Sequence, residues 1–197
     1  MRDKWYGDNR DLVKWGVLLE LSRRFGCSHI LQVLYYRSGM WASIQVDGEE
    51  VELCPDVISH FRDVSASTRL HNSLTIEVIS DEMRDRKNYL QLVCNRIDAR
   101  KLQPGIVFLD PDTGLQPAGK AGLEHVLDAE LQDIWKYLKS DDILVFYQHK
   151  TNRNGTEWVT PKKEQFEHAL NVQLGLAKVA YAPKIANDVV FFYIKKP

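Results

Sequence analysis

The chain has 197 residues, of which 44% are hydrophobic and 27% are charged, and its formal net charge is -1. A chain of this length and composition can bury a sizeable core, so we expect one globular domain over residues 1–197. The near-neutral charge excludes an overall positive field that would attract polyanions, although a local basic patch is still compatible with nucleic-acid binding. No stretch is apolar for long enough to cross a bilayer, and the first residues lack the apolar core of a signal peptide. We therefore expect a cytoplasmic protein without membrane contact.

The three cysteines are Cys27, Cys54 and Cys94, and none of them forms a C-x-x-C pair. Scattered cysteines in odd number do not predict a disulfide framework or a zinc site. We expect them to be free thiols that are buried or half-buried as small apolar side chains.

The N-terminal part of the chain predicts a helix and then a strand. Residues 8–24 open with cap-forming side chains and continue with apolar residues at helical spacing, and Gly26 marks the end of the helix. Residues 29–36 have the length and the aliphatic and aromatic content of a buried strand. Between about residues 42 and 70, apolar residues alternate around Asp47-Gly48, which predicts a hairpin or a small insertion.

The remainder of the chain alternates strand and helix patterns. Strands are predicted over residues 75–79, 106–109 and 143–147, and helices over residues 81–100, 123–138 and 161–172. A strand, a helix and a further strand form a crossover that favours a parallel sheet. Two closing strands, at residues 177–181 and 189–194, are joined by so short a link that we expect them to pair as an antiparallel hairpin.

The most informative segment is Ile106-Val-Phe-Leu-Asp-Pro-Asp-Thr-Gly-Leu-Gln-Pro117, in which an apolar run ends abruptly in two carboxylates. A continuous apolar run is typical of a strand that is buried on both faces. In open α/β sheets, ligands bind at the carboxyl ends of the strands. The alternative is an ordinary Asp-Pro turn that closes a core strand. The position of the segment between two strand-helix units and before a terminal hairpin favours a functional strand end.

The order of the elements resembles the class I S-adenosylmethionine-dependent methyltransferase fold. That fold is a three-layer α/β sandwich whose mostly parallel, Rossmann-like sheet ends in an antiparallel hairpin. Asp110-Pro111-Asp112 falls where amino-methyltransferases carry an Asp-Pro-Pro-aromatic motif. Gly7-Asp-Asn-Arg-Asp-Leu-Val-Lys-Trp15 is similar to the Gly-Asn-x-x-Asp-Val-Leu-Lys-His opening of ribosomal RNA adenine-N6 methyltransferases. Asp112-Thr113 departs from the family pattern, which has a second proline and a stacking aromatic there.

This resemblance implies S-adenosylmethionine as the cofactor and an exocyclic amine of RNA or DNA as the substrate. By this resemblance the catalytic loop consists of Asp110, Pro111 and Asp112, with Asp110 holding the amine and Pro111 shaping the loop. The cofactor would lie at the end of the first strand, which carries one glycine where the family has several. The candidate residues there are Tyr36, Arg37, Ser38 and Gly39, and the candidates for binding the ribose hydroxyls are Glu77 and Asp81.

Two other interpretations use the same residues. Asp110 and Asp112 together with Gln148-His149-Lys150 resemble the Asp plus Glu/Gln-x-Lys arrangement of Mg²⁺-dependent nucleases and phosphodiesterases, in which Lys150 would steady the attacking water. A non-catalytic binding scaffold on the same fold is the other.

The polar segment after the strand at residues 143–147 supplies the candidate substrate-binding residues. A nucleic acid would be bound by phosphate contacts from cations and by stacking on Trp158. The alternative is a surface loop whose Trp158 packs back onto the protein as an anchor. The candidate residues are Gln148, His149, Lys150, Arg153 and Trp158.

Overall fold

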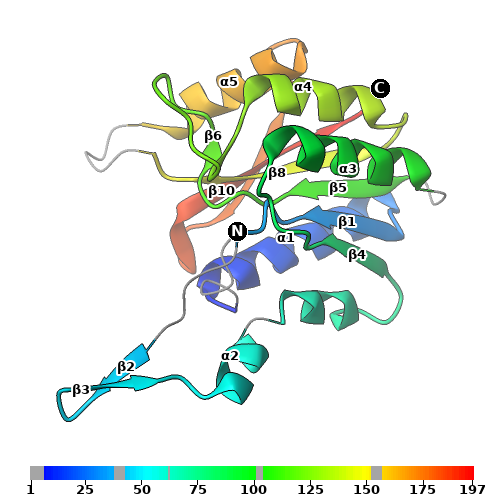
Figure 1. Ribbon diagram of the computed structural model, residues 1–197. Helices are drawn as coiled ribbons and strands as arrows, with labels where there is room; N and C mark the ends of the chain where they lie inside the picture. Colours follow the sequence, from blue (N-terminus) through cyan, green and yellow to red (C-terminus); the bar gives the residue numbers. More distant parts are fainter. Residues whose placement is uncertain (1–6, 38–42, 62, 101–103, 152–156) are drawn as a thin grey trace.

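A computed structural model describes residues 7–37, 43–61, 63–100, 104–151 and 157–197 (Figure 1). At its centre lies a six-stranded sheet in the order β4-β1-β5-β8-β10-β9. Its strands are β1 (His29–Val33), β4 (Thr75–Ile79), β5 (Gly105–Leu109), β8 (Ile143–His149), β9 (Lys178–Ala182) and β10 (Ala186–Lys195). Strands β4, β1, β5 and β8 are parallel, whereas β10 is antiparallel to both β8 and β9.

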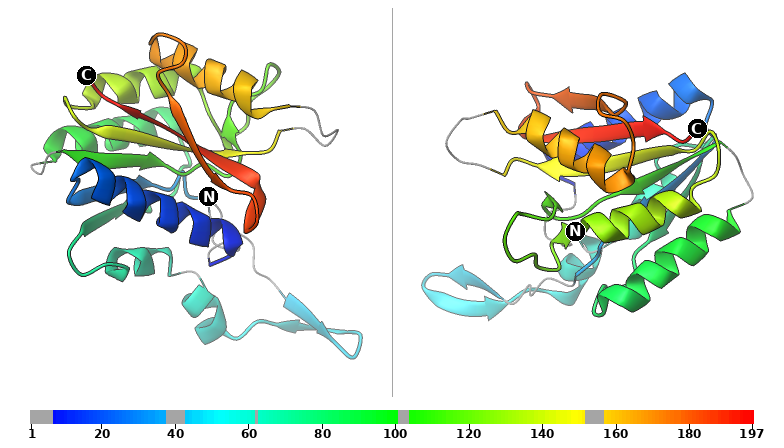
Figure 2. Two further views of the ribbon diagram at one scale, coloured as in Figure 1. Left: turned by 180° about the vertical axis from the view of Figure 1, so that it is seen from behind. Right: turned by 90° about the horizontal axis from the view of Figure 1, so that it is seen from above.

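Helices cover both faces of this sheet. Helix α1 (Asn9–Phe25) packs on one face, and α3 (Arg86–Ala99), α4 (Asp128–Tyr137) and α5 (Val159–Leu170) pack on the other (Figures 1 and 2). Residues of β5 alternate between the two cores: Ile106 and Phe108 face α1, and Val107 and Leu109 face the three helices. The predicted fold class, a three-layer α/β sandwich with a mostly parallel Rossmann-like sheet that ends in an antiparallel hairpin, is confirmed.

The first helix begins and ends where its sequence predicts. The Asp8 side chain accepts hydrogen bonds from the backbone N–H groups of Arg10 and Asp11, and Gly26 closes the helix in the left-handed conformation, with φ of 66°. The strand predicted over residues 29–36 is shorter, because β1 ends at Val33. Its extension is interrupted at Tyr35, whose φ of 46° is left-handed.

The hairpin predicted around Asp47-Gly48 is present. Strands β2 (Ser43–Val46) and β3 (Glu49–Glu52) pair antiparallel across a turn in which Asp47 and Gly48 have φ of 52° and 85°. Two positive φ values are typical of the tight turns that suit twisted hairpins. Helix α2 (Pro55–Phe61) and the 3₁₀ helix η2 (Val64–Arg69) follow, and the sequence patterns had predicted neither.

Two of the predicted helices begin later than their apolar patterns suggest. Helix α3 starts at Arg86, where the Asp85 side chain caps it, so Met83 is buried in the segment before the helix. Helix α4 starts at Asp128 because the preceding residues form β7 (His125–Val126), which pairs in parallel with β6 (Gly114–Leu115). Pairing with β6 therefore overrides the helical spacing of the residues before Asp128.

Three smaller expectations have mixed outcomes. Helix α5 starts two residues before the predicted position and ends at Leu170, where Asn171 caps it with φ of 54°. The thiols of Cys27, Cys54 and Cys94 are free, but Cys54 is exposed rather than buried. Among the described residues, no helix combines the length and the apolar composition that crossing a bilayer requires.

Candidate functional site

The carboxyl ends of β1, β5 and β8 meet at one edge of the sheet, beside the N-terminus of α1 (Figure 1). Val33 pairs with Leu109, and Leu109 pairs with Phe146, so β1 and β5 end at the same level and β8 continues beyond it to His149. The backbone N–H of Asp110 donates to the carbonyl oxygen of Val33 over 2.9 Å, which fixes the first residue after β5 against the end of β1.

Asp110 is only 2% exposed and lies on the side of the sheet that α1 covers. Its Oδ2 accepts hydrogen bonds from Lys14 Nζ and from Gln32 Nε2, both over 2.8 Å. Lys14 Nζ also lies 2.5 Å from Asp11 Oδ1, and Gly7 N donates to the other oxygen of Asp11. We call Asp11, Lys14 and Asp110 the carboxylate-lysine cluster.

Among the described residues, the two carboxylates of this cluster share one ammonium group. Burial raises the pKa of Asp110; Lys14 opposes this rise and the nearby charge of Asp11 adds to it. Burial alone would lower the pKa of Lys14, but Asp110 and Asp11 hold it above its ordinary value. The ammonium is therefore charged at neutral pH.

The cluster joins two sequence segments that are about a hundred residues apart. Asp11 and Lys14 belong to the segment over residues 7–15, and Asp110 belongs to the Asp-Pro loop. The sequence prediction noted both segments but not this contact. A partial signal is present in the sequence: Asp11 and Lys14 are spaced i, i+3 on the face of α1 that carries its apolar residues.

Arg37 lies across the same edge, where its guanidinium forms an ion pair with Asp112 and reaches Glu124 Oε2 over 3.5 Å. Burial favours the neutral form of Asp112, but the ion pair with Arg37 helps to hold the pKa of this carboxyl below its usual range. The resemblance assigned Arg37 to the cofactor site and Asp112 to the catalytic loop. In the structure these two side chains form an ion pair with each other.

The other predicted cofactor residues have different surroundings. The Tyr36 carbonyl oxygen accepts a 2.7 Å hydrogen bond from Met83 N, and Ser38 and Gly39 lie outside the described residues. Asp81 follows the carboxyl end of β4 and is exposed. Glu77, in contrast, lies within β4 and contacts His29 Nε2 over 3.1 Å at the amino end of β1. Glu77 is therefore directed away from the edge that holds Asp110.

Gln148 holds the Asp-Pro loop from inside the protein. Its side chain is fully buried; Oε1 accepts from Leu115 N over 2.9 Å, and Nε2 donates to Thr113 O over 3.2 Å. Gly114 has φ of 126°, and a Cβ at this position would collide with the Gln148 amide. These contacts favour a structural role for Gln148 rather than direct substrate contact.

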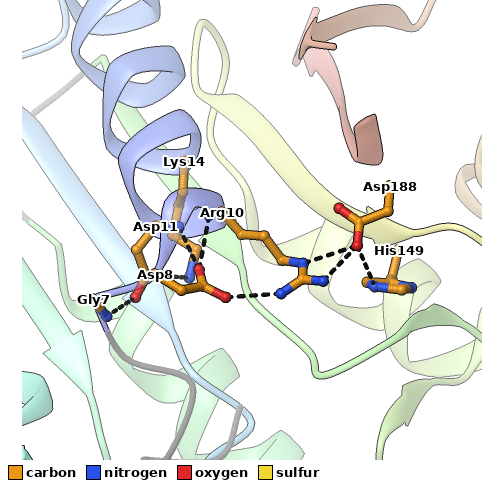
Figure 3. A network of polar contacts seen from close by, with 7 residues as sticks. All are labelled: Gly7, Asp8, Arg10, Asp11, Lys14, His149 and Asp188. Atoms are coloured by element: carbon orange, nitrogen blue, oxygen red, sulfur yellow. Dashed lines mark hydrogen bonds and ion pairs between the residues drawn. The ribbon is translucent and has the colours of Figure 1, made fainter. Parts of the chain in front are cut away.

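His149 is half-exposed and belongs to a polar network that links α1 with β8 and β10 (Figure 3). Its Nε2 lies 3.3 Å from Asp188 Oδ2, and the same oxygen accepts from Arg10 Nε and Nη2 over 3.2 and 2.5 Å. Arg10 Nη1 also donates to Asp8 over 2.8 Å. The network connects the start of α1 to the strand ends that surround Asp110.

The remaining substrate-binding candidates follow β8. The Lys150 side chain is half-buried, and its backbone N–H donates to Asp188 O over 2.7 Å. Arg153 lies outside the described residues. Trp158 is half-buried and packs against the core cluster beneath α5, which favours the anchor alternative for this side chain.

The geometry gives no support to the magnesium alternative. Asp110 contacts Lys14 and Gln32, whereas Asp112 contacts Arg37. Within the part of the chain that the structure describes, no group of three or more His, Cys, Asp or Glu residues is arranged to hold a metal ion.

Among solved structures, the chain is similar to one chain of a crystal structure of a fibrillarin/Nop5p complex, with a TM-score of 0.38 and 11% sequence identity. The similarity covers 87% of this chain and 74% of that chain. No protein-family model and no curated protein matches the sequence. Because the TM-score and the identity are both low, the functional argument depends on the residues of this chain alone.

Proposed function

We propose that this chain is a methyltransferase-like enzyme that uses S-adenosylmethionine to methylate an exocyclic amine of RNA or DNA. The observation that carries the proposal is the carboxylate-lysine cluster, in which Lys14 Nζ lies 2.8 Å from Asp110 Oδ2. Both segments that resemble amino-methyltransferases, residues 7–15 and the Asp-Pro loop, contribute to this one cluster. The finer resemblance, to ribosomal RNA adenine-N6 methyltransferases, depends on residues 7–15 and is part of the proposal.

The cofactor would be held at the end of β1, by Tyr36 and Arg37 together with Ser38 and Gly39. In this fold a glycine-rich turn lets the backbone approach the cofactor, and a left-handed backbone is one conformation that glycine provides. Here Tyr35 adopts that conformation, with φ of 46°, and its N–H donates to Tyr89 Oη over 3.0 Å. Asp81, exposed after β4, is the candidate for the ribose hydroxyls. The left-handed turn at Tyr35 and the exposed carboxylate of Asp81 support this placement of the cofactor, which would supply a reactive methyl group when bound.

The role of Asp110 in this proposal is to accept a hydrogen bond from the substrate amine and to orient its lone pair. Lys14 and Gln32 both bond to Oδ2, so Oδ1 is the oxygen that would receive the amine. The carboxylate of Asp110 would also stabilise positive charge that develops on the amine nitrogen. Because Asp110 is 2% exposed, the proposal requires that substrate binding displaces part of the chain covering this edge. Pro111 and Asp112 would shape the loop around the amine.

Direct contacts to the nucleic acid are proposed for His149, Lys150 and Arg153, at the end of β8 and in the segment that follows. Trp158 would add stacking only if it left its packing against the core. We also propose that residues 1–197 form one domain, in which residues 42–70 are an insertion between β1 and β4.

Calorimetry with S-adenosylmethionine and with its demethylated product tests the cofactor part of the proposal. The wild-type chain is expected to bind at least one of them, whereas no heat and no thermal shift at millimolar ligand would overturn the proposal. Transfer of a labelled methyl group to RNA and DNA tests the reaction itself. Asp110→Asn is expected to abolish transfer while cofactor binding persists, and Asp141→Asn, a change to an exposed carboxylate, serves as the control.

One observation favours a second candidate function, a non-catalytic binding scaffold on the same fold. The ion pair between Arg37 and Asp112 spans the edge at which the cofactor would lie. If neither cofactor form binds to the wild-type chain but binding appears in Arg37→Ala, the edge is closed by this ion pair and the scaffold is favoured.

A further inference from the structure

The hairpin formed by β2 and β3 has one apolar face and one polar face. Ile44 pairs with Val51 and Val46 pairs with Glu49, so these four side chains lie on one face. The opposite face carries Ser43, Gln45, Glu50 and Glu52.

The apolar face is exposed. Ile44, Val46 and Val51 are 47%, 46% and 43% exposed, and the hairpin projects away from the sheet in every view (Figures 1 and 2). None of the three belongs to a core cluster of the described residues. An isolated two-stranded hairpin is marginally stable in water, because it has nothing against which to bury its apolar side chains. Contact with a second surface would bury this face and stabilise the hairpin.

The hairpin and the start of α2 are strongly acidic. Residues 43–58 contain no Lys or Arg, and their acidic residues are Asp47, Glu49, Glu50, Glu52 and Asp56. Glu50 accepts a hydrogen bond from the Ser43 hydroxyl, and within the described residues no ion pair neutralises any of the five carboxylates. Since the whole chain has a formal net charge of only -1, the negative charge is concentrated here and the rest of the chain is net positive.

We propose that residues 43–58 form a docking arm for a partner protein whose contact surface is apolar and is surrounded by Lys and Arg side chains. The apolar face supplies the contact area, and the carboxylates around it select basic partners and repel acidic ones. The same charge disfavours phosphate backbones and anionic lipid surfaces as occupants. Among the described residues no further strand pairs with β2 or β3, so their outer edges also allow an extended basic segment of the partner to add as a strand. This proposal does not depend on the enzymatic one.

Two labelled synthetic peptides of equal length test the arm, one alternating valine with lysine and the other alternating valine with glutamate. Fluorescence anisotropy with the full chain, at low and at physiological salt, is expected to show binding of the valine-lysine peptide only. Ile44→Ser with Val51→Ser is expected to weaken that binding about tenfold or more, because it removes the apolar contact. Leu174→Ser with Leu176→Ser, which alters two equally exposed apolar side chains elsewhere, is the matched control and is expected to bind as the wild type does.

A charge-reversed variant keeps the test informative if the serine variant loses the hairpin. Glu49→Lys with Glu50→Lys and Glu52→Lys preserves the apolar face and is expected to switch the preference to the valine-glutamate peptide. Equal binding by the serine variant and its control, or equal binding of both peptides to the wild type, would overturn the proposal. Analytical sedimentation tests whether the arm instead binds a second copy of this chain. A dimer of the wild type that disappears in the serine variant would show such self-association, and the proposed basic partner would be wrong.

Discussion

Asp110 and Asp142 are both buried carboxylates beside a buried cation, but they lie at opposite ends of the parallel strands and have different described partners. Asp142 is fully buried at the amino end of the sheet, forms an ion pair with Arg100, and accepts hydrogen bonds from Gly105 N and Lys139 N, each over 3.0 Å. One carboxylate, Asp142, is paired there with one guanidinium, Arg100. At the carboxyl end, Asp110 and Asp11 share the Lys14 ammonium among the described residues. Asp142 lies at the amino end of the strands, whereas Asp110 lies at the carboxyl edge, where ligands bind in open α/β sheets, so we assign a structural role to Asp142 and propose a functional one for Asp110.

We predict that Asp142→Asn destabilises the protein by about 3 kcal/mol or more, because removal of one partner leaves the Arg100 charge buried without compensation. Urea unfolding measures the loss. The neighbouring carboxylate provides the control, since Asp141 forms an exposed pair with Lys195. Asp141→Asn is expected to change the free energy of unfolding by less than about 1 kcal/mol. Equal effects of the two changes would contradict the structural role of the Asp142 pair.

We predict that Lys14→Met destabilises the protein more at pH 8 than at pH 5. The pKa of Asp110 is already raised in the folded protein, so the folded state retains a proton that the unfolded chain releases. Between the ordinary and the raised pKa, the contribution of this group to the free energy of unfolding therefore falls as the pH rises. Removing the ammonium raises the pKa of Asp110 further and extends this range upward.

Urea unfolding at both pH values measures the difference for Lys14→Met. Adding Asp110→Asn to this variant is expected to remove most of the pH dependence, because the carboxyl that titrates is gone. Lys136→Met, which breaks an exposed i, i+3 pair with Asp133, is the control and is expected to show little dependence on pH. A destabilisation by Lys14→Met that is equal at both pH values would indicate that Lys14 acts by packing alone.

At the scale of the elements, the sequence predicts the interior strands best. Residues 75–79, 106–109 and 143–147 are continuous apolar or alternating runs, and each is part of a strand. Predictions fail where a tertiary contact overrides the local pattern. Pairing of β7 with β6 shortens the helix predicted from residue 123, and the left-handed Tyr35 ends β1 within an apolar run. Neither the β6–β7 pairing nor the conformation of Tyr35 can be predicted from a window of neighbouring residues.

The Asp-Pro loop and β8 are coupled through Gln148, which leads to a prediction for the loop. Gln148→Ala removes the hydrogen bonds to Leu115 N and Thr113 O, so amide hydrogen exchange of Leu115 is expected to become faster by about tenfold or more, corresponding to a bond of about 1.4 kcal/mol. His149→Ala is the control, because it leaves the Gln148 amide in place. If the Leu115 amide exchanges at the wild-type rate in Gln148→Ala, the loop is held by its backbone contacts alone.

At the scale of the whole molecule, the sequence predicts where the candidate site lies in the fold but not which side chains meet there. The end of β5 follows from the apolar run and the carboxylates after it, and the carboxyl edge follows from parallel topology. The contact between Lys14 and Asp110 depends on how α1 crosses the sheet, which no local pattern encodes. The ion pair between Arg37 and Asp112 has the same cause: two loops on neighbouring strands meet only once the sheet has formed.

The molecule consists of a packed sandwich and a projecting arm, and this division leads to a last prediction. Every buried apolar residue of the three core clusters lies outside residues 43–58. Replacing residues 43–52 with a flexible Gly-Ser linker of equal length is therefore expected to change the free energy of unfolding by less than about 0.5 kcal/mol, as is usual for surface changes. Phe192→Ala, at a fully buried position in β10, is the positive control and is expected to cost about 3–5 kcal/mol. Urea unfolding of both variants measures the contrast. A loss of stability in the linker variant close to that of Phe192→Ala would show that the hairpin is part of the cooperative core. The hairpin would then not be a separate arm that is available to bind a partner.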